Sequence, residues 1–142
     1  MSLQFPHLYR LKIQLMIPLV SMSIKLLGIK KTCHLMKKFS NSKPATLEDT
    51  LPNAGFFLKV LRHAVNQTFW KGNCLSRSLV LYWILTRQGI TAEFYIGVKT
   101  QPQFKAHAWV EHKGVPLNLR KSLLNKYQPV NDLGKAEGMT FI

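Results

Sequence analysis

Acidic residues are scarce in this chain of 142 residues, which has 6 Asp and Glu against 20 Lys and Arg and a net charge of +14. No acidic residue precedes Glu48, and none lies between Thr50 and Ala92. Such a field attracts nucleic acid, anionic lipid or an acidic peptide. The basic residues are scattered and the aromatic residues do not alternate with them, unlike on a base-stacking surface. We therefore expect no nucleic-acid partner.

Cysteine is scarce too, with Cys33 and Cys74 as the two residues of that type. A chain of this length can bury a core of its own and does not need a disulfide for stability. Two thiols would also be a thin framework for a secreted protein, so we expect a reduced chain in the cytoplasm. Apolar residues at 46% and charged residues at 18% exclude intrinsic disorder.

A long uninterrupted apolar run is missing. The most apolar stretch, residues 11–29, is interrupted by Lys12, Pro18 and Lys25, whereas a bilayer span needs about 20 consecutive apolar residues. No small-x-small cleavage site closes the stretch, so we predict no signal peptide. We interpret it as a helix that packs on the domain and completes the core. The alternative is that it lies on a membrane surface or on a partner protein.

The chain divides at a polar break over residues 40–44. We predict a basic, apolar helical segment over residues 1–43 and a core domain over residues 44–142. Within the core, Pro52 is expected to end any helix that begins before it. Asn53 is expected to cap the next helix, which has Phe57, Val60 and Leu61 on one face.

Residues 71–73 have turn chemistry, and Asn73 is a good helix cap. The helix predicted from Cys74 to Gln88 is apolar on nearly all sides, which is typical of a buried central helix. Beyond Gly89 the apolar period becomes alternating. It predicts strands over residues 92–99, 105–112 and 115–119, with a short turn before the third and an irregular tail from Leu123. Helices followed by an antiparallel sheet indicate an α+β fold.

Two residues can carry nucleophilic chemistry. Cys74 lies in the first turn of the central helix, where unpaired N–H groups and the helix dipole favour a thiolate. His107 lies on a strand between the small residues Ala106 and Ala108 and can meet Cys74 as its base. On spacing alone, a buried cysteine and an interior histidine that only pack remain an alternative. A basic protein that binds nucleic acid or a membrane surface would leave both features unexplained.

The strings around these residues are more specific than their spacing. The run from Trp70 through Cys74 to Leu79, the run from Arg87 to Ala92, Ile96-Gly-Val and Phe104-Lys-Ala-His-Ala-Trp-Val-Glu111 together resemble the leader peptidase of lasso-peptide biosynthesis. That family has a transglutaminase-like, papain-related core, and the resemblance covers about Leu58 to Leu119.

The resemblance implies a cysteine peptidase, with Cys74 as nucleophile and His107 as general base, that removes the leader from a ribosomally made precursor peptide. It also implies two partners besides the precursor, a leader-binding protein and an ATP-using lasso cyclase. No metal-binding spacing, phosphate-cradling glycine loop or serine nucleophile elbow is present, so we predict no metal or other cofactor.

One position departs from the family. Its third catalytic residue, an Asp after the hairpin turn, falls in Val115-Pro-Leu-Asn-Leu-Arg120, which contains no acid. Asn118 is the predicted stand-in, because an Asn can fix the tautomer of a His ring without supplying a charge. A distant acid such as Asp132 is the alternative support for His107. If Leu119 occupies the position instead, the enzyme is slow or inactive. The alternative function is therefore an impaired module that binds a peptide without cleaving it.

Three further residues are predicted to contact the substrate. Trp70 and Trp109 are expected to wall the site, with plain core packing as the alternative. Arg77, one turn beyond Cys74, is expected to favour the thiolate or to meet an acidic leader, with a solvated side chain as the alternative. His112, which directly precedes the hairpin turn, is expected to be exposed.

Overall fold

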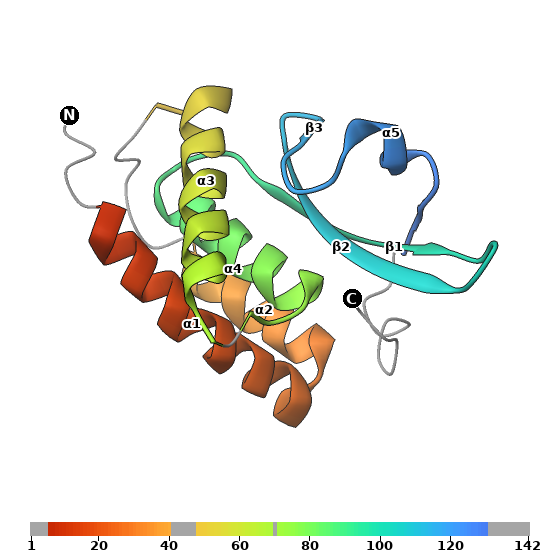
Figure 1. Cartoon of the computed structure of the whole chain (residues 1–142), viewed down its shortest axis with the longest axis horizontal. Coiled ribbons are helices and arrows are strands. Elements are labelled where there is room, and N and C mark those ends of the chain that lie inside the picture. Colours follow the sequence, from red (N-terminus) through yellow and green to blue (C-terminus); the bar gives the residue numbers. More distant parts are fainter. Residues whose placement is uncertain (1–5, 41–47, 70, 131–142) are drawn as a thin grey trace.

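A computed structural model describes residues 6–40, 48–69 and 71–130. Four helices gather on one side of the molecule and an antiparallel sheet lies on the other (Figure 1). This arrangement confirms the predicted α+β class with helices ahead of the sheet. The elements in chain order are α1 (Pro6–Leu27), α2 (Ile29–Ser40), α3 (Leu51–Gln67), α4 (Cys74–Arg87), β1 (Glu93–Lys99), β2 (Lys105–His112), β3 (Val115–Pro116), α5 (Lys121–Leu124) and β4 (Gln128–Pro129).

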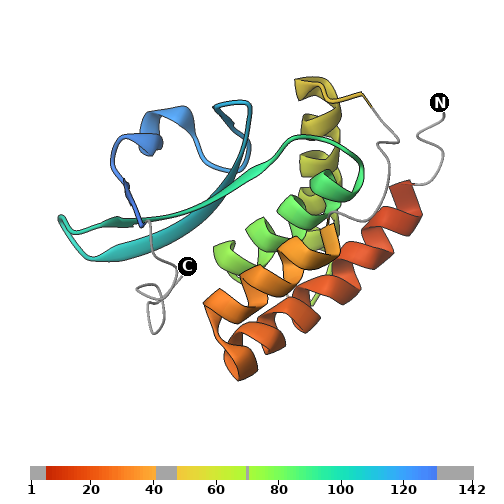
Figure 2. The same ribbon diagram turned by 180° about the vertical axis from the view of Figure 1, so that it is seen from behind.

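The sheet has the order β3-β2-β1-β4, and all three pairings are antiparallel (Figure 2). Strand β2 has the predicted bounds. The third strand was predicted over residues 115–119 and is shorter, because Leu117 leaves the ladder with a single hydrogen bond to Val110 O at 2.9 Å. The prediction of an irregular tail from Leu123 was wrong up to Val130, and the rest of the tail lies outside the described residues. Strand β4 pairs with β1, and Val130 N donates to Ile96 O at 2.7 Å.

Helix α4 is the centre of the fold and contacts α1, α2, α3, β1 and β2. Its Leu75, Leu79 and Leu85 are fully buried, as expected for a helix that is apolar on most sides. The helix ends as predicted, with Ile90 N donating to Leu85 O at 3.0 Å past Gly89. The predicted central helix is therefore confirmed at both ends.

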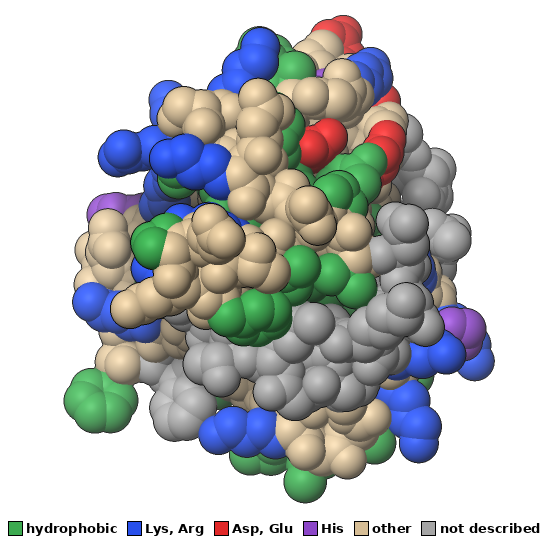
Figure 3. All heavy atoms as spheres, turned by 90° about the vertical axis from the view of Figure 1, so that its right-hand side faces the viewer, with side chains coloured by type: hydrophobic (Ala, Val, Ile, Leu, Met, Phe, Trp, Pro, Cys, Tyr) green, Lys and Arg blue, Asp and Glu red, His purple; other side chains and the backbone are tan. Residues whose placement is uncertain are grey.

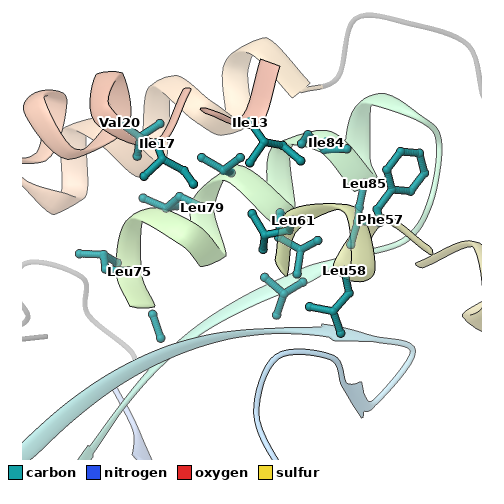
Figure 4. Close-up of a cluster of buried hydrophobic side chains, with 14 of the residues drawn as sticks. Ile13, Ile17, Val20, Phe57, Leu58, Leu61, Leu75, Leu79, Ile84 and Leu85 are labelled. Carbon is teal, nitrogen blue, oxygen red and sulfur yellow. The ribbon is translucent and has the colours of Figure 1, made fainter. Parts of the chain in front are cut away.

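Helix α1 completes this core. Its Ile13, Ile17 and Val20 are buried and point toward Leu79 of α4 (Figure 4). Within the described ranges, no helix is long and apolar enough to cross a membrane. The predicted boundary between residues 43 and 44 lies outside the described residues.

The start of α3 differs from the prediction. Thr50, not Asn53, is the N-cap, and its hydroxyl accepts a hydrogen bond from Asn53 N. Pro52 begins this helix instead of ending one, because the first turn does not need the N–H that proline lacks. The sequence thus predicted a helix end at Pro52, where the structure has a helix start.

Asp49 joins three elements just before α3. Its carboxylate accepts hydrogen bonds from the Thr91 amide at 2.8 Å, from the Thr91 hydroxyl and from His112 Nε2 at 2.8 Å. Lys113 Nζ donates to the Asp49 backbone carbonyl at 2.9 Å. The expectation of an exposed His112 was wrong, since its exposed fraction is 3%. Asp49, which is distant from His112 in the sequence, allows this polar ring to be buried.

The hydrogen bond from the Thr91 hydroxyl, more than those from the Thr91 amide and His112, holds the pKa of Asp49 well below its usual range. The folded pKa is thus lower than the unfolded value of about 4. The stabilising contribution of Asp49 is therefore present above about pH 4 and is lost as the pH falls toward the folded pKa.

We expect Asp49→Asn to lower the free energy of unfolding at pH 7 by about 1–2 kcal/mol, because Thr91 and His112 lose a charged acceptor. The variant should also lose less stability than the native chain between about pH 5 and pH 2. Urea denaturation at several pH values measures both effects. The control is Glu48→Gln, which changes the exposed neighbouring acid. Equal losses in the two variants would contradict the role of Asp49.

Candidate active site

Cys74 is positioned by a tight turn and a capping box. Ser76 N donates to Asn73 Oδ1 at 2.9 Å, and Asn73 N donates to Ser76 Oγ at 3.1 Å. The turn before them needs glycine: Gly72 has φ +64°, and a Cβ there would lie 2.5 Å from Ser76 Oγ and 2.6 Å from Ile17 Cγ2. Cys74 is therefore fixed at the N-terminus of α4, with 6% of its surface exposed.

His107 lies in the middle of β2, opposite Gly97 of β1. Its ring is 5.6 Å from the ring of Tyr127, centroid to centroid. Tyr127 can approach the sheet here because Gly97 has no side chain. A Cβ at that position would lie 2.7 Å from Trp109 and 2.9 Å from Tyr127. Sequence reasoning missed Tyr127, because nothing in the aperiodic segment around it indicates that it returns to the sheet.

Cys74 and His107 line one cavity of about 570 Å³. Arg77 and Asn118 line it as well, so the structure brings together four of the six residues predicted for the site. The opposite wall comes from α3, which sequence reasoning had treated only as an amphipathic helix. Its contributions are Leu58, Leu61, Arg62, Val65 and Asn66.

Asn118 links the central helix to the sheet. Its Oδ1 accepts from Val110 N at 2.8 Å, and its Nδ2 donates to Ser78 Oγ at 2.7 Å. Ser78 Oγ in turn donates to Ala108 O at 3.0 Å. Asn118 thus has a structural role, whether or not it also orients the ring of His107. Leu119 is buried and is absent from the cavity lining.

The His107 ring has no acidic partner among the described residues, and Asp132 lies outside them. Its Nε2 atom is buried and has no hydrogen-bond partner among the described residues. Burial, and then the charge of Arg77, lower the pKa of His107. Arg77 is itself fixed beside the start of α4, because its Nε donates to Asn73 O at 3.2 Å. The imidazole is therefore neutral at neutral pH, which is the form that can accept a proton from a thiol.

Of the two tryptophans predicted to contact substrate, Trp109 does not line this cavity. Trp109 is 2% exposed, stacks on Tyr95 at 5.7 Å and donates from Nε1 to Glu111 Oε1 at 3.0 Å. It is not among the residues that line the cavity. Trp70 lies outside the described residues. A substrate contact for either tryptophan stays a prediction.

The fold and this site define a class. Residues 17–132 match the Transglutaminase-like superfamily, and because they are more than half of the chain, the chain belongs to that superfamily. A curated relative is the microcin J25-processing protein McjB of Escherichia coli, 36% identical over 64 residues. The matched region covers 45% of this chain and 30% of McjB, less than a third of that protein. No solved structure matches the chain.

We expect Asn118→Ala to lower the free energy of unfolding by about 2–3 kcal/mol, because the Val110 amide and the Ser78 hydroxyl both lose a partner. Asn118→Asp should recover part of this loss, since a carboxylate can still accept from Val110 N but cannot donate to Ser78. Urea denaturation measures the three stabilities. Asn66→Ala is the matched control, an exposed amide on the same cavity. If both alanine variants unfolded alike, Asn118 would not be the link between α4 and β2.

Proposed function

We propose that the chain is a cysteine peptidase that removes the leader from a lasso-type precursor peptide. The observation that carries the proposal is the meeting of Cys74 and His107 in one cavity, with the cysteine at a helix N-terminus. Membership of the transglutaminase-like superfamily and the similarity to a microcin-processing protein support it. The similarity of the strings from Leu58 to Leu119 to leader peptidases agrees with that assignment.

The proposed reaction is amide hydrolysis in two halves. His107 takes the proton of the Cys74 thiol, and the sulfur attacks the carbonyl carbon after the leader. His107 then gives the proton to the departing amine, which leaves a thioester on Cys74. Water attacks the thioester, with His107 as base, and the thiol and the leader carboxylate are released. Backbone N–H groups in the first turn of α4 would stabilise the oxyanion.

The ring of His107 needs an orienting contact, and the usual acid is missing. We propose that Tyr127 and the strand pairing of β2 restrict the ring, while Asn118 acts through the backbone of β2. Asn118 is then a positioning residue. An acid would also stabilise the imidazolium, so a peptidase that lacks one is expected to be slower.

The cavity walls suggest what the substrate carries near the scissile bond. Leu58, Leu61 and Val65 offer apolar surface, and Arg62 and Arg77 offer two guanidinium groups. None of the described residues that line the cavity is acidic. These walls favour a peptide with an apolar residue beside an acidic one. We further propose a cytoplasmic protein that receives the precursor from a leader-binding partner and passes the product to an ATP-using cyclase.

The second candidate is an impaired module that holds the peptide without cutting it. The buried Nε2 atom of His107 favours this candidate, because no described residue gives that nitrogen a hydrogen bond that would orient the ring. Cleavage and binding are separable by experiment.

We expect the protein to cut the small precursor peptide encoded beside it once, with a leader-binding partner present, as read by mass spectrometry. Cys74→Ala should abolish the cut, because no other group in the site supplies the nucleophile. Cys33→Ala is the matched control, since Cys33 is the second buried cysteine and lies in α2. Cleavage that persists in Cys74→Ala would refute the mechanism. Tight binding with no cut by the native chain would favour the impaired module.

We also expect the rate of Cys74 alkylation by iodoacetamide to rise with pH through a midpoint below about 8, since helix N-termini and nearby cations favour thiolate. Arg77→Gln should move this midpoint upward, and Arg77→Lys should restore most of the shift. Arg62→Gln, which changes a guanidinium on the α3 wall, is the control. An ordinary midpoint near 8.5 in the native chain, unchanged by Arg77→Gln, would speak against an activated nucleophile.

A further inference from the structure

Helix α1 has a second apolar face that the fold does not use. Six large apolar side chains on it are between 54% and 76% exposed. They recur every three or four residues, so they fall within one narrow arc of the helix and extend along about 27 Å of its length. We call this set the outer stripe: Leu8, Leu11, Leu15, Leu19, Met22 and Leu26.

The outer stripe is not needed for the core, because the opposite face of α1 supplies Ile13, Ile17 and Val20 to it. Single exposed leucines are ordinary on a protein surface, but a continuous exposed stripe of this length marks an interaction site. The helix is therefore apolar on two faces, and only one of them has its partner within the described residues.

An apolar groove of about 450 Å³ continues the stripe across the helices. Leu19 belongs to both, and the groove reaches Leu35 and Phe39 of α2 and Trp83 of α4. Phe39, at the far end of the groove, is 58% exposed. The apolar surface thus spans α1 and α2 and reaches α4.

The charge around this surface has one sign. Helices α1 and α2 contain no acidic residue and seven basic ones: Arg10, Lys12, Lys25, Lys30, Lys31, Lys37 and Lys38. The acids of the described residues lie elsewhere. Glu48 and Asp49 precede α3, and Glu93 and Glu111 face each other across β1 and β2. In the view onto the sheet side, the described acidic side chains that are visible lie in the upper half of the molecule (Figure 3).

These observations distinguish three occupants. A second copy of the chain would bring seven more positive charges to the same face, which opposes association. A partner protein would need an apolar strip and an acidic rim that match a convex helix. An anionic bilayer surface offers both hydrocarbon and negative charge without a fixed shape, and basic amphipathic helices bind such surfaces in the plane of the headgroups.

We propose that the outer stripe and its groove dock the protein on an anionic lipid bilayer, with α1 lying in the interface. Because α1 and α2 lie at the edge of the molecule farthest from the sheet, the bound protein keeps the sheet away from the membrane (Figures 1 and 2). The cavity of Cys74 and His107 lies between α3, α4 and β2 and stays open. The proposal does not depend on the peptidase activity.

The test is sedimentation of the full chain with vesicles of phosphatidylcholine alone and of phosphatidylcholine mixed with phosphatidylglycerol. We expect binding to the mixed vesicles that is at least about tenfold tighter than to neutral ones and that weakens as salt is raised. Leu15→Gln combined with Leu19→Gln should weaken binding at least about tenfold, since both side chains are about two-thirds exposed. Phe104→Gln, an equally drastic change of an exposed residue on the β1–β2 loop, should leave it unchanged.

Circular dichroism melting checks that the double variant folds. Hydrogen exchange of the native chain gives a readout that needs no variant, because vesicles should slow exchange in α1 and not in α3. Absent binding to the mixed vesicles, or equal binding by the double variant, would overturn the proposal. A dimer that the double variant dissolves, or a leader-binding partner that occupies the stripe while vesicles do not, would overturn it in favour of a protein interface.

Discussion

The site depends on the attachment of α4 to β2. Cys74 and His107 come from two elements that are joined only through β1, so the chain between them does not fix their relative position. The hydrogen bonds of Ser78 with Ala108 O and with Asn118 Nδ2, together with that from Val110 N to Asn118 Oδ1, set that position. All of them are buried or part-buried, where an unsatisfied group would destabilise the fold. Asn118, the predicted replacement for the acid of the family, therefore holds α4 to β2.

The scarcity of acid shapes the site as well as the surface. Among the described residues, no carboxylate lines the cavity wall and a guanidinium lies beside the helix start, and burial keeps His107 neutral. The helix N-terminus and Arg77 favour an anion on the sulfur of Cys74, whereas no described acidic side chain favours a cation on the ring. In the proposed reaction, the electrostatic assistance therefore acts on the nucleophile more than on the base. Asp49, an acid of the described residues, accepts from Thr91 and His112 at the start of α3 instead.

Features with a local cause were predictable from the sequence. The cap at Asn73, the buried helix from Cys74 and the alternating strand with His107 all follow from neighbouring residues, and all agree with the structure. What the sequence could not reveal depends on distant partners. His112 is buried because Asp49, 63 residues earlier, accepts a hydrogen bond from its ring. Asn118 bonds to Ser78 across 40 residues, and Tyr127 reaches His107 through a two-residue strand. Periodicity and capping rules carry no information about such contacts.

The contacts of Gly72 and Gly97 determine when the site forms as the chain is synthesised. The turn that presents Cys74 packs against Ile17, and the ring of His107 packs against Tyr127. The two reactive groups thus depend on segments on either side of them, one early and one late in the chain. As the chain leaves the ribosome, Cys74 is made long before Tyr127, so the ring of His107 gains its contact only when the later segment has docked on the sheet. In the proposed peptidase, a nascent chain would therefore carry a base without that contact and would have little power to attack peptides around it.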